Sequence, residues 1–165
     1  MSSLIAPRPN GGSLYTPAER ARRDATRWTL VQGVLAPVQF AVFLVSAALV
    51  LRFMATGEGY GLATLSVVAK TGVLYLIMVT GAIWEKVVFG RYLFAPAFFW
   101  EDAVSMVVIA LHTAYLAGLL TGAMGPQALM WTALAAYLVY VVNAAQFVLK
   151  LRAARLQATP RGVPA

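Results

Sequence analysis

The sequence predicts an all-α, polytopic membrane protein: a bundle of four transmembrane helices with both termini in the cytoplasm and a basic interfacial helix near the N-terminus. Hydrophobic residues make up 61% of the chain and charged residues only 12%, whereas soluble domains are about 45–50% apolar and about 25% charged. The apolar residues gather into four runs of the length that a bilayer requires, about 20 residues. The basic residues gather near the two ends and at one central corner.

The chain divides into three parts. Residues 1–28 form an N-terminal arm, in which Thr16 and Glu19 have the spacing of a capping box and start a short basic helix. We expect this helix to lie on the membrane surface, ahead of a membrane domain at residues 29–150. Residues 151–165 are expected to form a basic, disordered tail.

The four transmembrane helices are expected at about residues 29–51, 62–89, 96–122 and 127–149. Pro37 is expected to kink the first of them. Lys70 lies well inside the second, where a lysine costs about 2.5–3.5 kcal/mol on insertion scales. We expect Lys70 to extend toward the nearer membrane surface; the alternative is that it pairs with an acid or a substrate.

Positive charge predicts the orientation, because short loops rich in Lys and Arg stay in the cytoplasm. The N-terminal arm, the C-terminal tail and the corner between the second and third helices are basic. The loop after the third helix carries no charge, and the loop after the first carries one Arg and one Glu. Both termini and the corner are therefore expected in the cytoplasm.

The central corner, residues 81–102, holds three of the six acidic residues. Gly90 is a natural helix end, and Pro96 suits the first turn of the next helix. Glu85 and Glu101 lie equally far from the middle of the corner, so we expect their carboxyl groups to meet at one depth between two antiparallel helices. Acids inside a membrane protein indicate a functional site.

Polar side chains gather in the cytoplasmic half of the predicted bundle: Gln32, Gln39, Glu85, Lys86, Glu101, Ser105, Asn143 and Gln146. Gln32 and Gln39 share a helix face, which is either a polar seam between helices or the wall of a pocket. Such one-sidedness favours a site over a seam that merely holds helices together.

Composition excludes several kinds of chemistry. The chain has no cysteine, so disulfides, thiolate chemistry and iron–sulfur clusters are excluded. The single histidine, His112, excludes bis-histidine haem within one chain and the paired Glu-x-x-His pattern of a helical di-iron site. The net charge of +7 lies mostly at the chain ends, which suits an anionic lipid surface and not nucleic acid.

Six motifs resemble the vinyl (bacterio)chlorophyllide hydratase family: residues 15–20, 29–37, 81–90, 93–102, 111–115 and 140–146. The resemblance runs from about Tyr15 to Leu156. It implies hydration of the 3-vinyl group of chlorophyllide a or 3-vinyl bacteriochlorophyllide a to a 1-hydroxyethyl group in bacteriochlorophyll biosynthesis. It implies a substrate that carries Mg, no redox cofactor, and a bacterial cytoplasmic (inner) or intracytoplasmic photosynthetic membrane. Other pigment-biosynthesis enzymes are candidate partners.

Hydration of an isolated vinyl group needs an acid that keeps its proton, a group that orients water, and a dry aromatic slot. Burial and a second carboxylate both favour the protonated form of a carboxyl group. We expect Glu85 to be the acid and Glu101 to orient water or stabilise the cation, although reversed roles stay open. Asp102 points about 100° away from Glu101 and is expected to stabilise the helix end. The competing interpretation is a corner salt bridge from Glu85 to Lys86 or Arg91.

The residues expected to contact the substrate are Gln32, Gln39, Trp84, Lys86, Arg91, Trp100, Ser105, His112, Asn143 and Gln146. A propionate on the substrate would suit Lys86, Arg91, Lys150 or Arg152. His112 is expected to be an ordinary buried histidine, because magnesium prefers oxygen ligands in proteins. Its alternative role is axial ligand to the substrate's Mg; no metal site of the protein itself is expected.

Two other function classes compete with the enzyme. A non-catalytic pigment- or quinone-binding subunit would depend on His112 alone. A small proton-coupled carrier would also use membrane acids and Lys70, but it would need polar groups through the full thickness of the bilayer. The polar residues thin out on the far side of this bundle, which favours the hydratase.

Overall fold

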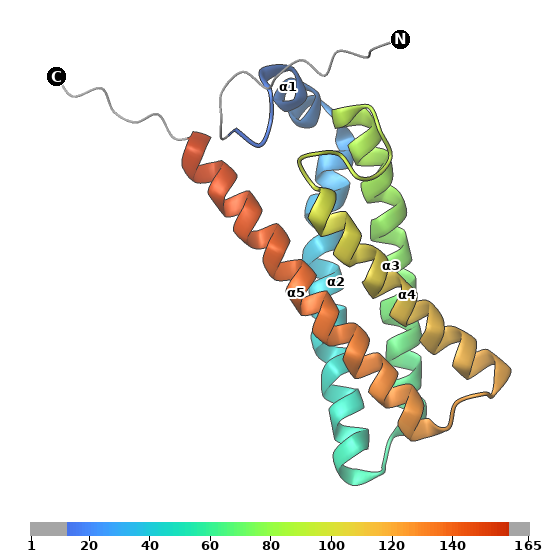
Figure 1. The fold of residues 1–165 in the computed structure, drawn as a ribbon. Coiled ribbons are helices and arrows are strands. Elements are labelled where there is room, and N and C mark those ends of the chain that lie inside the picture. Colours follow the sequence, from blue (N-terminus) through green and yellow to red (C-terminus); the bar gives the residue numbers. More distant parts are fainter. Residues whose placement is uncertain (1–12, 159–165) are drawn as a thin grey trace.

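The computed structural model describes residues 13–158. Within them the chain forms five helices (Figure 1): α1 Pro17–Ala25, α2 Arg27–Thr56, α3 Tyr60–Phe89, α4 Phe99–Thr121 and α5 Pro126–Ala158. The last four are long and apolar enough to cross a membrane. The expectation of an all-helical chain with four spanning helices is thus confirmed for the described residues.

The N-terminal capping box is present as expected. The Glu19 backbone N–H donates to the Thr16 hydroxyl at 3.3 Å, and the Thr16 N–H donates to the Glu19 carboxylate at 2.7 Å. Thr26 then breaks the helix with an extended backbone and caps α2 through its hydroxyl. The Arg22 side chain donates to the Val88 carbonyl at 2.8 Å, which ties α1 to the end of α3.

The spanning helices form two hairpins. α2 packs along α3 and α4 packs along α5, while α3 and α4 touch over a short stretch. Gly90 ends α3 with φ of 84°, in the left-handed region that a helix end requires. α1, the α3–α4 connection and the last turns of α5 lie at one end of the bundle, and the other two loops lie at the opposite end (Figure 1).

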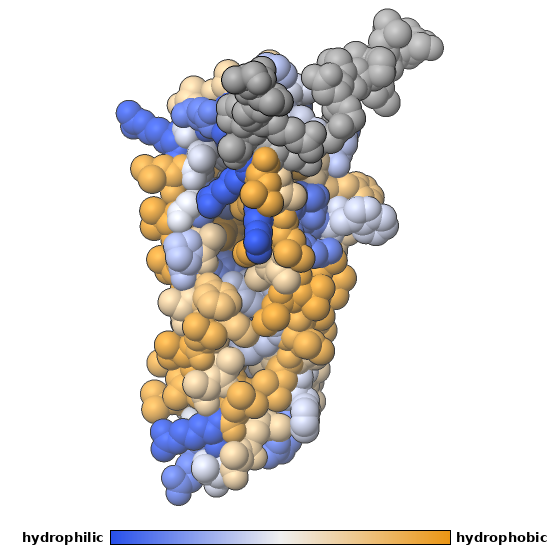
Figure 2. All heavy atoms as spheres, turned by 90° about the vertical axis from the view of Figure 1, so that its left-hand side faces the viewer, coloured by the Kyte–Doolittle hydropathy of each residue, from blue (hydrophilic) through white to orange (hydrophobic). Residues whose placement is uncertain are grey.

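The surface between the two ends is largely apolar. Figure 2 shows hydrophobic residues over most of the visible face, with hydrophilic residues gathered toward the two ends. In the most apolar 18-residue stretch of each spanning helix, only 22–28% of the residues are buried inside the protein. Most apolar side chains therefore face outward, as they do in a protein surrounded by lipid.

Three helix boundaries differ by three residues or more from the sequence-based expectation. α2 continues to Thr56, five residues beyond its expected end at residue 51. α4 begins at Phe99, not at residue 96, and Pro96 lies in the turn that precedes it. α5 continues to Ala158, so residues 151–158, expected to belong to a disordered tail, are helical. Residues 1–12 and 159–165 of the arm and tail lie outside the described residues.

Candidate functional site

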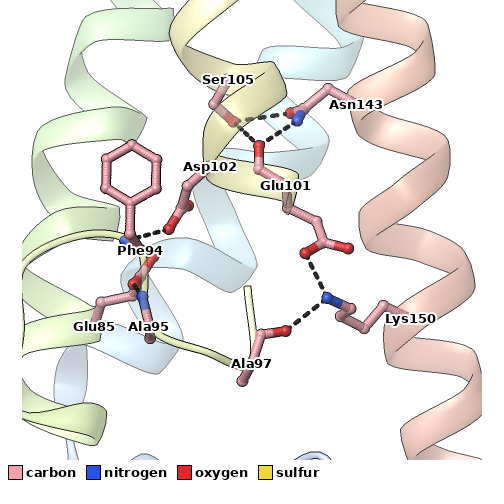
Figure 3. A network of polar contacts seen from close by, with 9 residues as sticks. All are labelled: Glu85, Phe94, Ala95, Ala97, Glu101, Asp102, Ser105, Asn143 and Lys150. Carbon is pink, nitrogen blue, oxygen red and sulfur yellow. Dashed lines mark hydrogen bonds and ion pairs between the residues drawn. The ribbon is translucent and has the colours of Figure 1, made fainter. Parts of the chain in front are cut away.

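Two buried carboxyl groups meet at the end of the bundle that holds the α3–α4 connection. Glu85 lies in the last turns of α3, and Asp102 lies in the first turn of α4. Glu85 is 5% exposed and Asp102 is 3% exposed. Their side chains interact directly with each other, and Figure 3 shows them side by side.

The connection between the helices holds these carboxyl groups with consecutive backbone N–H groups. Phe94 N–H donates to Asp102 Oδ2 at 2.7 Å, and Ala95 N–H donates to Glu85 Oε2 at 3.2 Å (Figure 3). Phe94 has φ of 58°, a left-handed conformation that is unusual and strained for a bulky residue. Such strain gathers at functional sites, where the surrounding structure must hold it in place.

The expected pairing of Glu85 with Glu101 is wrong, because the carboxyl partner of Glu85 is Asp102. Neighbouring residues on a helix point about 100° apart. With α4 starting at Phe99, this offset turns Asp102 toward α3 and Glu101 toward α5. Asp102 is therefore a member of the acid pair as well as a residue of the first helical turn.

Glu101 is bound by α5. It forms an ion pair with Lys150, whose Nζ also donates to the Ala97 carbonyl at 2.6 Å. The backbone carbonyl of Glu101 accepts from Ser105 Oγ and from Asn143 Nδ2, both at 2.8 Å. These contacts fasten the start of α4 to α5 (Figure 3) and bring together three of the expected site residues.

The alternative interpretation, a salt bridge from Glu85 to Lys86 or Arg91, is not found among the ion pairs of the described residues. Lys86 Nζ donates to the Gly90 carbonyl at 2.9 Å, and Arg91 donates to the Phe94 carbonyl at 3.3 Å. Both side chains are exposed at the same end of the bundle as the acid pair.

An aromatic cluster lies next to the acid pair. Phe98 packs against Trp84 and Phe147, with ring centroids 5.7 and 5.8 Å away. Tyr15 stacks on Phe89 at 5.9 Å and is 5% exposed; burial raises the pKa of its hydroxyl above the usual value, so the phenol stays neutral. Tyr15 of the N-terminal arm and Phe98 of the corner therefore belong to the same apolar cluster.

Several expected site residues lie elsewhere. Trp100 is 70% exposed on the outer surface. Gln32 donates to the Thr80 hydroxyl at 2.8 Å and thereby links α2 to α3. His112 lies ten residues beyond Asp102, about 15 Å along α4 at 1.5 Å per residue. Gln39 and His112 belong to the centre of the bundle, and Gln146 Oε1 is buried without a partner among the described residues.

Lys70 does not reach toward the surface as expected. It is fully buried, and its Nζ lies 3.8 Å from the centroid of the Tyr140 ring. Inside a bundle, a lysine can exchange contact with water for contact with the face of an aromatic ring, which is attractive to a cation. No ion pair formed by the described residues includes Lys70.

Sequence reasoning missed the donors that position the acids. From the sequence, Lys150 is a candidate partner only for a substrate propionate, because no sequence signal links it to Glu101, 49 residues away. The N–H groups of Phe94 and Ala95 carry no side-chain signature at all. A long, glycine-ended loop beside two acids is the one hint, because loop N–H groups have no helical partner.

Comparison with known proteins identifies the family. A family model described as 2-vinyl bacteriochlorophyllide hydratase matches residues 15–153. A relative of that name from Cereibacter sphaeroides is 69% identical over 144 residues, covering 87% of this chain and 89% of the relative. One of the same name from Rhodobacter capsulatus is 66% identical over 150 residues, covering 91% and 87%. No solved structure matches. The chain belongs to the 2-vinyl bacteriochlorophyllide hydratase family.

Proposed function

We propose that this chain adds water to the vinyl group of chlorophyllide a or 3-vinyl bacteriochlorophyllide a, giving a 1-hydroxyethyl group. The vinyl group has position 2 in the family description and position 3 in the ring numbering used here. Support comes from the two relatives, both of which carry the hydratase name. The structural observation that carries the proposal is the buried contact between Glu85 and Asp102.

The acid pair supplies the proton. Two carboxyl groups in contact and shielded from water share one proton, because the negative charge of one disfavours ionisation of the other. Glu85 is the proton donor in this proposal, and Asp102 is the ionised partner that accepts the hydrogen bond from Phe94 N–H. The proton goes to the terminal vinyl carbon, and the cation that forms at the inner carbon is delocalised into the macrocycle.

Water then completes the addition. Its oxygen bonds to the inner carbon, and it returns one proton to the carboxylate that was left, so the net change is one added water. The reaction neither oxidises nor reduces the substrate, and we propose that the protein uses no cofactor of its own. Glu101, held by its ion pair with Lys150, stabilises the cation or orients the water.

The surroundings of the pair suit a chlorin. The aromatic cluster around Phe98 and Trp84 offers ring faces and excludes water. Lys86, Arg91 and Arg152 are exposed at this end of the bundle, and we propose that they hold the substrate's propionate. Lys150 already forms an ion pair with Glu101, so we expect it to contribute less to binding the propionate.

We propose a cytoplasmic orientation for this end of the bundle, in a bacterial cytoplasmic or intracytoplasmic photosynthetic membrane. The basic residues of α1 and of the end of α5 support it through the positive-inside rule. In this orientation α1 lies at the membrane surface. Cysteines placed at positions 91 and 58 in intact cells should label from opposite sides, with position 58 outside; external labelling at position 91 would refute the orientation.

The experiment for the activity uses purified protein in lipid nanodiscs with chlorophyllide a in H₂¹⁸O. We expect a blue-shifted product whose mass has increased by one ¹⁸O-labelled water. Binding of the pigment without any mass change would indicate a non-catalytic pigment-binding subunit. Neither binding nor turnover, together with proton uptake into sealed vesicles, would indicate a carrier.

A further inference from the structure

A second group of buried polar side chains lies at the middle of the bundle, and every spanning helix contributes to it. We refer to it as the central cluster: Gln39 from α2, Lys70 from α3, His112 from α4, and Tyr137 and Tyr140 from α5. None of the five is more than 6% exposed. They lie far from the acid pair, since Lys70 precedes Glu85 by 15 residues, about 22 Å along α3.

The members of the central cluster contact one another, and Gln39 joins them through a side-chain hydrogen-bonding interaction with Tyr140. Lys70 Nζ lies over the Tyr140 ring at 3.8 Å, and Lys70 and His112 are near enough to interact electrostatically. The His112 ring lies 5.8 Å from Tyr137. Phe43 packs against both tyrosines at 5.4 and 5.0 Å, so the polar atoms are enclosed by aromatic rings.

Three polar atoms of this cluster have no hydrogen-bond partner among the described residues: Lys70 Nζ, His112 Nε2 and Gln39 Oε1. The tautomer of the neutral histidine follows from its other nitrogen. His112 Nδ1 lies 2.8 Å from the Val108 carbonyl, which only accepts, so Nδ1 carries the hydrogen. Nε2 of the neutral ring is then a bare acceptor. The three atoms therefore comprise one donor group and two acceptors.

This combination selects the occupant. An anion would suit Lys70 but would be repelled by the lone pairs of His112 Nε2 and Gln39 Oε1. A metal ion would suit those two lone pairs but would be repelled by the lysine ammonium. Water both donates and accepts, and buried waters typically make about three hydrogen bonds to otherwise unsatisfied polar groups.

We propose that the central cluster is an internal water site, in which bound water accepts from Lys70 Nζ and donates to His112 Nε2 and Gln39 Oε1. The water meets the hydrogen-bonding needs of a lysine that forms no ion pair with an acid among residues 13–158. It accounts for how a lysine can be buried where four helices converge in an apolar bundle. The water site is separate from the acid pair, so this proposal does not depend on the proposed reaction.

X-ray radiolysis of the protein in nanodiscs tests the proposal, because hydroxyl radicals form from bound water and oxidise the side chains beside it. We expect mass spectrometry to find oxidation of His112, Tyr137 and Tyr140 despite their burial. Met130 is equally buried and intrinsically more reactive, so it is the internal control for a dry part of the core. Labelling of the cluster at or below the level of Met130 would overturn the proposal.

Two variants sharpen the test. Lys70→Met removes the donor at similar length, and the labelling of His112 and Tyr140 should be lost. Thr71→Val is the matched control, because Thr71 is also fully buried but its hydroxyl donates to the Val67 carbonyl of its own helix at 2.8 Å; its labelling should equal that of wild type. Labelling that persists in Lys70→Met would refute the site, and if that variant does not fold, the wild-type comparison with Met130 decides.

A third variant separates water from the other candidate for His112, axial ligation of a magnesium chlorin. We expect His112→Leu to bind chlorophyllide a with wild-type affinity in a fluorescence titration. A loss of pigment binding in folded His112→Leu protein would assign the imidazole to the magnesium and overturn the water site.

Discussion

The corner and the centre of the bundle both bury ionisable side chains, but they satisfy them differently. At the corner, Glu85 and Asp102 each accept a backbone N–H from the α3–α4 connection, and Glu101 has Lys150. At the centre, Lys70 Nζ and His112 Nε2 have no hydrogen-bond partner among the described residues. In a loop, backbone N–H groups have no helical partner and can donate to a side chain. In the interior of a helix, the backbone N–H groups already donate to carbonyls of the same helix.

This difference explains where a reactive group can be held in a membrane bundle. A loop can fix a carboxyl group from its backbone, with little dependence on side-chain identity. A group in mid-helix depends on other side chains or on water. We therefore propose that the chemistry takes place at the corner.

The largest effect is expected from the acid pair. Glu85→Gln and Asp102→Asn should each lower turnover by about 10²–10⁴-fold, because each removes the shared proton or the partner that holds it. Turnover of wild type should also fall as pH rises and the shared proton is lost. Stopped-flow absorbance with saturating chlorophyllide a measures both effects.

Glu58→Gln is the matched control for these variants, since it removes an exposed acid from the α2–α3 loop at the opposite end of the bundle. Its turnover should equal that of wild type. Asp102→Asn with full turnover would leave Asp102 a purely structural role at the start of α4. Full turnover in both pair variants would remove the chemistry from the corner.

A smaller effect is expected from the ion pair. Lys150→Met should destabilise the protein by about 1.5–3 kcal/mol, because it leaves the Glu101 carboxylate buried and the Ala97 carbonyl without its donor. Glu101→Gln combined with Lys150→Met should recover part of that loss, since no unpaired charge remains. Denaturation in mixed micelles measures both variants. Equal stability of Lys150→Met and wild type would show that the pair contributes nothing to folding.

A further test concerns the backbone of the connection. Phe94→Gly and Phe94→Ala both remove the ring, but only glycine adopts φ of 58° without strain. The glycine variant should therefore be more stable than the alanine variant by about 1–2 kcal/mol. Thermal unfolding of the two proteins gives the difference directly. An alanine variant as stable as the glycine variant would mean that Phe94 does not hold this conformation.

The sequence predicts the helices well and the partners in the site poorly, for physical reasons. The length of an apolar run predicts the length of a spanning helix, because the thickness of the lipid bilayer sets both. Gly90 predicts a helix end, because glycine readily adopts the left-handed conformation found there. Symmetry about the corner was an unreliable guide to which acid faces Glu85. A shift of three residues in the start of α4 decides between Glu101 and Asp102, and Pro96 does not fix that start. The sequence does not predict the burial of Lys70, because its aromatic neighbour, Tyr140, comes from another helix 70 residues away.

The smallest effect on turnover is expected at the centre. Lys70→Met removes the charge of the central cluster but leaves every contact of the acid pair in place, about 22 Å away along α3. Turnover per folded molecule should therefore stay closer to wild type than in any corner variant. The measurement is single-turnover hydration by protein whose folded fraction has been counted by size-exclusion chromatography. If folded Lys70→Met protein binds chlorophyllide a but does not hydrate it, while Asp102→Asn does, the reaction takes place at the central cluster, and the corner is only the structural end of the bundle.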